Sequence, residues 1–196
     1  MTDESTITRE DAEYAFNTLT ELIGNIDGAV FTLAEAIDSA NDRRLDHMMF
    51  VHIFRMTVSW VILSLAKSKE LWGRYGKLAQ EHTKTSMRAI MKEIDTRGIV
   101  SLRNKAIAHL LDKETNQPIS PEKLQMEFAA MVRGNLQDFI HWVRHPEGGA
   151  DGVTTVMRRF KDEIKNRFPD IKNYNEVALA PGESLGSLPI SGPRIA

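Results

Sequence analysis

The chain has 196 residues, of which 42% are hydrophobic, and this is enough for one domain of ordinary size with a hydrophobic core. The 25 basic and 27 acidic side chains nearly cancel, so any affinity for nucleic acid requires a local basic patch. The absence of cysteine excludes disulfides, thiolate nucleophiles and cysteine-ligated metal sites. Because the first residues are polar and acidic, unlike a signal peptide, we expect a soluble cytoplasmic protein.

The first predicted element is a long amphipathic helix that ends near residues 39–42. Thr8 and Asp11 have the spacing of a capping box, with Asp in place of Glu. Apolar residues follow at steps of three and four through Ile37, as expected for one buried helix face. Gly24 and Gly28 lie inside this helix and either permit a close helix contact or mark a bend.

The second predicted helix, from about residue 43 to 66, is apolar almost all round and should therefore be the most buried. Its polar residues His52, Arg55 and Ser59 share one stripe, since they are three and four residues apart. Buried polar groups need partners, so we expect this stripe either to face a cleft and bind RNA or to form an internal hydrogen-bond network. An arginine and a histidine within the apolar run favour a core helix over a membrane span.

Residues 67–76 are predicted to form a short connecting helix or turn. A basic, aromatic cluster lies in and next to this segment and could stack bases and contact phosphates, although a solvated connector is the simpler interpretation. The members of the cluster are Lys67, Lys69, Trp72, Arg74, Tyr75 and Lys77. A third helix is predicted from about residue 83 to 96, with its end at Gly98. A fourth is predicted from about residue 99 to 112.

Ser120, Pro121 and Glu122 form a strong helix start, with an N-cap serine and proline at the first helical position. The pattern predicts one continuous helix from there to Val143, and a last amphipathic helix over residues 153–168. Pro, Gly and Ser then replace the helical pattern. We therefore predict an all-α fold with a helical bundle over 1–145, a linker and accessory helix over 146–168, and an irregular tail over 169–196.

The fourth predicted helix carries Arg103, Asn104, four further residues and His109. An Arg–polar–x4–His arrangement in an all-helical chain, with Ala108 directly before the histidine, resembles the active-site motif of HEPN-type ribonucleases. The string RNKAIAH is similar to the branch found in phage abortive-infection proteins, the AbiU2-like group. The resemblance covers residues 10–145 loosely and about ten residues closely. It implies a HEPN-like bundle that cleaves RNA without a metal or other cofactor.

The resemblance implies a role for each residue of the motif. His109 would act as general base or acid on the 2′-hydroxyl of RNA, and Arg103 would bind the scissile phosphate. Asn104 would orient one of them, and Lys105 would add phosphate affinity. On a regular helix Arg103 and His109 lie about 9 Å apart along the axis and about 120° apart around it. We therefore expect two motifs to converge in a homodimer, as the family resemblance also implies.

One other interpretation of the motif stays open at this stage. Arg103 could instead pair with an acidic neighbour and His109 could be an interface histidine, which would leave an inactive bundle that binds a partner protein or nucleotide. Asp138, His141 and His145 share a helix face, but two histidines in a last helical turn suit the helix dipole, so we predict no metal site. For the nuclease, the expected partners are tRNA or mRNA, a second copy of the chain and a cognate antitoxin.

Overall fold

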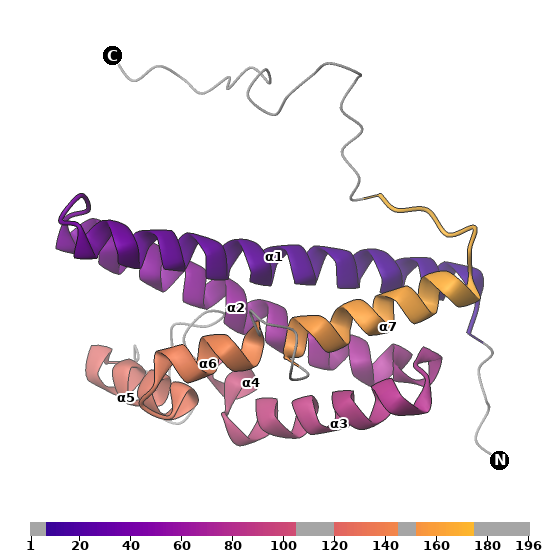
Figure 1. Cartoon of the computed structure of the whole chain (residues 1–196). Helices are drawn as coiled ribbons and strands as arrows, with labels where there is room; N and C mark the ends of the chain where they lie inside the picture. The colour runs from indigo at the N-terminus through magenta and orange to yellow at the C-terminus, as the bar shows by residue number, and fades with distance from the viewer. Residues whose placement is uncertain (1–6, 105–119, 145–151, 175–196) are drawn as a thin grey trace, which may run out of the picture.

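The computed structural model describes residues 7–104, 120–144 and 152–174, and every regular element in these ranges is a helix. The predicted all-α bundle is therefore confirmed (Figure 1). The elements are α1 (Arg9–Asn41), α2 (His47–Tyr75), the short 3-10 helix η1 (Gly76–Leu78), α3 (Glu81–Thr96), α4 (Ile99–Leu102), α5 (Pro121–Val132), α6 (Leu136–Val143) and α7 (Val153–Arg167).

The start of α1 is the predicted capping box. The Thr8 hydroxyl accepts a hydrogen bond from the Asp11 N–H, and the Asp11 carboxylate accepts one from the Thr8 N–H. The Thr8 N–H and the Thr8 hydroxyl both donate to the Asp11 carboxylate, and these two bonds lower the pKa of Asp11. Of the two alternatives for Gly24 and Gly28, the close helix contact is wrong, because a Cβ at either position would meet nothing within 4 Å. Both glycines instead lie on the solvent side of α1.

Two predictions about α2 are wrong. The helix does not end near residue 66 but runs to Tyr75, so the predicted connector is its last part. Nor is it the most buried helix, because large apolar side chains are exposed along it: Met48, Met49, Met56, Trp60 and Leu63. The physical reason is that α1, its main neighbour, covers only one side (Figure 1). By length and composition alone, residues 47–78 would be apolar enough to cross a membrane, a test that core helices of soluble proteins also pass.

α7 belongs to the centre of the core and is not an accessory helix. Val153, Val156, Met157, Phe160 and Ile164 are fully buried, and they pack with the apolar faces of the other helices in one cluster. Each of these buried side chains contributes about 1.5–3 kcal/mol, so α7 is a large contributor to the stability of the fold. Figure 1 shows α7 alongside α1, with α3 on its other side.

The predicted continuous helix over residues 121–143 is two helices. Ser120 caps the start as expected, since its hydroxyl accepts a hydrogen bond from the Lys123 N–H. Arg133 and Gly134 then both adopt positive φ and break the helix, and the Asn135 side chain caps α6. The Gly134-Asn135 pair was the sequence signal for this break, because glycine accepts positive φ and asparagine is a favoured N-cap residue.

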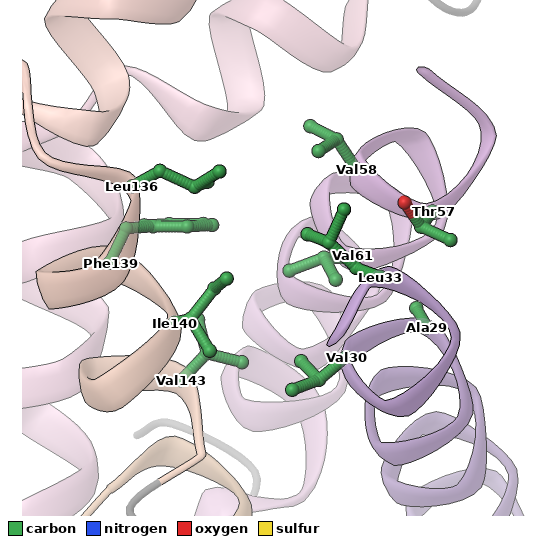
Figure 2. Close-up of a pocket in the computed structure, with 10 residues that line it drawn as sticks. All are labelled: Ala29, Val30, Leu33, Thr57, Val58, Val61, Leu136, Phe139, Ile140 and Val143. Atoms are coloured by element: carbon green, nitrogen blue, oxygen red, sulfur yellow. The ribbon is translucent and has the colours of Figure 1, made fainter. Parts of the chain in front are cut away.

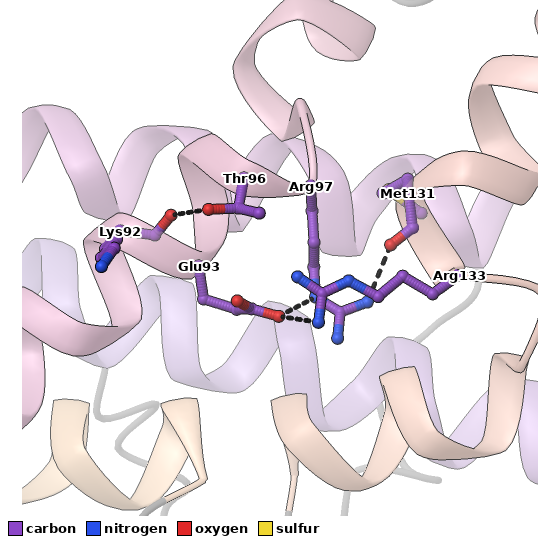
Figure 3. A network of polar contacts seen from close by, with 6 residues as sticks. All are labelled: Lys92, Glu93, Thr96, Arg97, Met131 and Arg133. Carbon is purple, nitrogen blue, oxygen red and sulfur yellow. Dashed lines mark hydrogen bonds and ion pairs between the residues drawn. The ribbon is translucent and has the colours of Figure 1, made fainter.

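Arg97 joins α3 to α5 (Figure 3) and, through the Trp142 ring, to α6. Its guanidinium donates to Glu93 at 2.9 Å and to the Met131 carbonyl at 2.8 Å, while Arg133 contacts the same Glu93 oxygen. The Arg97 guanidinium also lies 4.9 Å from the centre of the Trp142 ring. One largely buried cation thus links three helices just before the chain enters α4.

α6 packs its apolar face against the α1–α2 hairpin (Figure 2). Phe139, Ile140 and Val143 lie across from Val30 and Val61 around an apolar cavity of about 10 Å³. A space of this size holds at most one water. The polar residue in its lining, Thr57, donates its hydroxyl to backbone carbonyls of α2, so the space is a packing defect and not a ligand site.

Candidate functional site

The candidate site begins where α4 meets the protein surface. Gly98 has a φ of 66°, which favours glycine, and this turn carries the chain from α3 into α4 as predicted. Ile99 and Leu102 anchor α4 because both are buried in the core. Arg103 and Asn104 follow with π-type helical geometry, a form that is frequent at functional sites.

Arg103 forms an ion pair with Glu70 on α2, with 2.5 Å between Arg103 Nη1 and Glu70 Oε1. The Arg103 Nε donates to the Asn104 side-chain oxygen at 3.0 Å, so Asn104 orients the guanidinium. The Arg103 side chain is 24% exposed and that of Glu70 is 63% exposed. Pairs this accessible to solvent contribute at most about 1 kcal/mol, and an incoming phosphate can therefore displace the carboxylate.

The structure brings Arg103 and Asn104 together but does not test the rest of the motif. Lys105 and His109 lie outside the described residues. The homodimer in which two motifs would converge involves a second chain, and it also stays a prediction.

His52 and Arg55 do not form the buried stripe that the sequence suggested. Both side chains are exposed on α2, and Ser59 is half-buried. The prediction failed because it assumed that α2 is covered all round. Along α2, Arg55 is about 22 Å and His52 about 27 Å from Glu70, since each residue adds about 1.5 Å. Within one chain neither can reach a phosphate bound at Arg103.

The basic, aromatic cluster of residues 67–77 does not offer a stacking platform. Trp72 packs edge-on against Phe160, with 5.6 Å between ring centres, and Tyr75 is buried. Lys67 pairs with Glu21, and Lys69 pairs with Asp95. These side chains stabilise the end of α2 instead of presenting aromatic faces to bases.

Within the described parts of the chain, no group of three His, Cys, Asp or Glu side chains could hold a metal ion. Asp138 accepts a hydrogen bond from the Asn135 amide at the start of α6, and His141 lies in its last turn. His145 lies outside the described residues.

Glu70 is the residue of this site that sequence reasoning missed. It lies 33 residues before Arg103, in a segment assigned to a connector. No local pattern signals a contact between positions so far apart, and only the packing of α4 against α2 creates it.

Comparison with known proteins gives one likeness in fold. No family model and no curated protein matches the chain. A solved structure, the integron cassette protein Vpc_cass2 from the mobile metagenome of V. paracholerae, is similar with a TM-score of 0.66 and 24% sequence identity. The match covers 84% of this chain and 98% of that one. At this identity the likeness concerns the fold alone.

Proposed function

We propose that this protein is a metal-independent endoribonuclease of the HEPN type, acting as a toxin or abortive-infection effector. The observation that carries the proposal is the state of Arg103, which is oriented by Asn104 and paired only with a well-exposed carboxylate among the described residues. Such an arginine can exchange Glu70 for a phosphate of RNA and bind it with two parallel hydrogen bonds.

The chemistry requires a histidine beside this arginine. The 2′-hydroxyl of RNA is the nucleophile, and His109 would remove its proton or protonate the leaving 5′-oxygen. Arg103 would stabilise the negative charge that develops on the phosphate. The products would be a 2′,3′-cyclic phosphate and a 5′-hydroxyl. Lys105 would add phosphate affinity, and two chains would supply the site together as a homodimer.

The test compares the wild-type protein with Arg103→Ala and His109→Ala in an RNA digest that contains EDTA. Removal of either side chain should reduce cleavage at least about 100-fold, the usual loss when a group that stabilises the transition state is removed. Arg88→Ala is the matched control, because Arg88 is an exposed arginine on α3 remote from the motif. Undiminished cleavage by either motif variant would refute the assignment.

The same ion pair supports a second candidate, a catalytically inactive bundle that binds a partner protein or nucleotide. In that case the Arg103–Glu70 pair would serve only to fix α4 on α2. A pure wild-type protein without EDTA-resistant nuclease activity, on tRNA and on mRNA, would favour this alternative.

A further inference from the structure

A groove of about 280 Å³ runs along the solvent side of the α1–α2 hairpin. Gly24 and Gly28 lie along its α1 side, and Met56 and Trp60 along its α2 side. The two glycines leave open space above α1, while Met56 and Trp60 are 52% and 47% exposed. None of the lining residues is charged. The groove therefore suits an uncharged, apolar segment.

The chain that follows α7 is bound to the same side of α1. The Asn17 amide donates to the Lys172 carbonyl at 2.8 Å, and its oxygen accepts from the Tyr174 N–H at 2.8 Å. Glu13 accepts from the Lys172 N–H and from the Tyr174 hydroxyl, and these bonds lower the pKa of Glu13. This stretch of residues 172–174 is thus fixed on α1 by both backbone and side chain.

The direction of this stretch leads to the groove. Arg9 holds the carbonyl of Asp170, and Asn17 holds Tyr174, so the chain runs from the start of α1 toward its middle (Figure 1). At about 100° per residue, Gly24 and Gly28 lie within about 20° of Asn17 around the helix axis. The groove is therefore the next surface along the same stripe.

The length of chain beyond Tyr174 matches the distance. Gly28 lies about 16 Å from Asn17 along α1, at about 1.5 Å per residue. Five extended residues span about 16 Å, at about 3.3 Å each, which brings Leu179 level with Gly28. Residues 177–181 are Val-Ala-Leu-Ala-Pro, without a charge. In an extended chain Val177 and Leu179 point to the same side.

Asn25 offers a second amide for such a segment. Its side chain lines the groove two turns after Asn17, and within the described part of the chain it has no hydrogen-bond partner. Asn17 already shows how an asparagine of α1 binds the carbonyl and the N–H of an extended chain. Asn25 lies about 12 Å further along the helix and about 80° around its axis from Asn17, so it flanks the stripe and can bind backbone groups near Val177 from the side.

We propose that residues 177–181 of the same chain bind in this groove, with Val177 and Leu179 against Gly24, Gly28 and Trp60. The segment covers the exposed apolar side chains of the hairpin and fixes the start of the tail along α1. The groove is then an intramolecular docking site and is closed to a second copy of the chain. This inference does not depend on the proposed nuclease activity.

The absence of native cysteine makes a direct test possible in the full chain. The test pair is Gly28→Cys with Leu179→Cys, and the control pair is Ala89→Cys with Leu179→Cys, because Ala89 is a small, exposed residue on α3. Under mild oxidation the test pair should form an intramolecular disulfide roughly tenfold faster than the control pair, since docking raises the local concentration of the thiols. Gly28→Cys should fold, because the added side chain enters open space.

A second measurement uses the single variant Gly28→Cys and its reaction with a maleimide. Labelling should be several-fold slower with the native tail than when Val177→Asp and Leu179→Asp are added, whereas Ala89→Cys should react equally in both backgrounds. Equal rates of disulfide formation in the test and control pairs would overturn the proposal. So would equal rates of labelling of Gly28→Cys with the native tail and with the tail that carries the two aspartates. A disulfide-linked dimer of Gly28→Cys as the main product would also overturn it, because the occupant would then be a second copy.

Discussion

Arg97 and Arg103 lie six residues apart, on either side of α4, yet their surroundings differ. The Arg97 side chain is 8% exposed, and it is held by Glu93, the Met131 carbonyl and the Trp142 ring. The Arg103 side chain is 24% exposed and bonds to Asn104 and to Glu70, whose own side chain is 63% exposed. Arg97 therefore joins helices, whereas Arg103 lies near the surface and its partner is exposed to solvent.

The contrast follows from desolvation. A buried guanidinium loses its water, which lowers the pKa of Arg97, and the nearby Glu93 opposes this effect. Its hydrogen bonds must therefore be kept, because an unpaired partner in that environment is costly. Arg103 keeps access to water, so its ion pair contributes little to folding and leaves the cation available. The residues next to the two arginines in the sequence do not signal this difference. Packing alone decides which arginine is structural and which can bind an anion.

The largest expected effect is on Arg97. Arg97→Met should lower the free energy of unfolding by about 3 kcal/mol, because it leaves the Met131 carbonyl without its donor and removes a cation from Glu93. Urea unfolding followed by circular dichroism measures this loss. Arg97→Lys keeps the charge and should cost less. A loss below about 1 kcal/mol for Arg97→Met would mean that the buried network is not structural.

The matching change at the surface site should be mild for folding. Arg103→Met should lower the free energy of unfolding by less than about 1 kcal/mol, since it removes only a solvent-accessible ion pair. The same urea titration makes the comparison with Arg97→Met direct. Equal destabilisation by the two variants would erase the distinction between the arginines and remove the basis for an exchangeable phosphate ligand.

The smallest expected effect concerns Glu70. Glu70→Gln removes the carboxylate that competes with phosphate for Arg103, and it should raise the affinity for RNA about twofold to fivefold, equivalent to less than about 1 kcal/mol. Fluorescence anisotropy with a labelled RNA in low salt would measure this change. Glu35→Gln, an exposed acid on α1, alters the net charge equally and should leave affinity nearly unchanged. Weaker binding by Glu70→Gln would indicate that Glu70 positions Arg103 instead of competing for it.

Local signals in the sequence predicted much of the helical order. Thr8 with Asp11, Ser120 with Pro121, and Gly98 all act within one helical turn, and the structure has each of them in the expected role. The break between α5 and α6 was missed although Gly134 and Asn135 signalled it, since the apolar period continues across them. For the candidate site, the sequence identified Arg103 and Asn104 but not Glu70, because the ion pair joins two helices that are remote in sequence.

The sequence by itself determined that this chain is helical, where most helices begin, and which residues can carry phosphate chemistry, because periodicity, capping and side-chain type are local properties. The tertiary structure alone decided which apolar faces are covered. It left Met56 and Trp60 of α2 exposed, made α7 a core helix, and placed Arg103 against Glu70 at the surface. Burial depends on which other helices pack against a helix, and the sequence of one helix does not specify these neighbours.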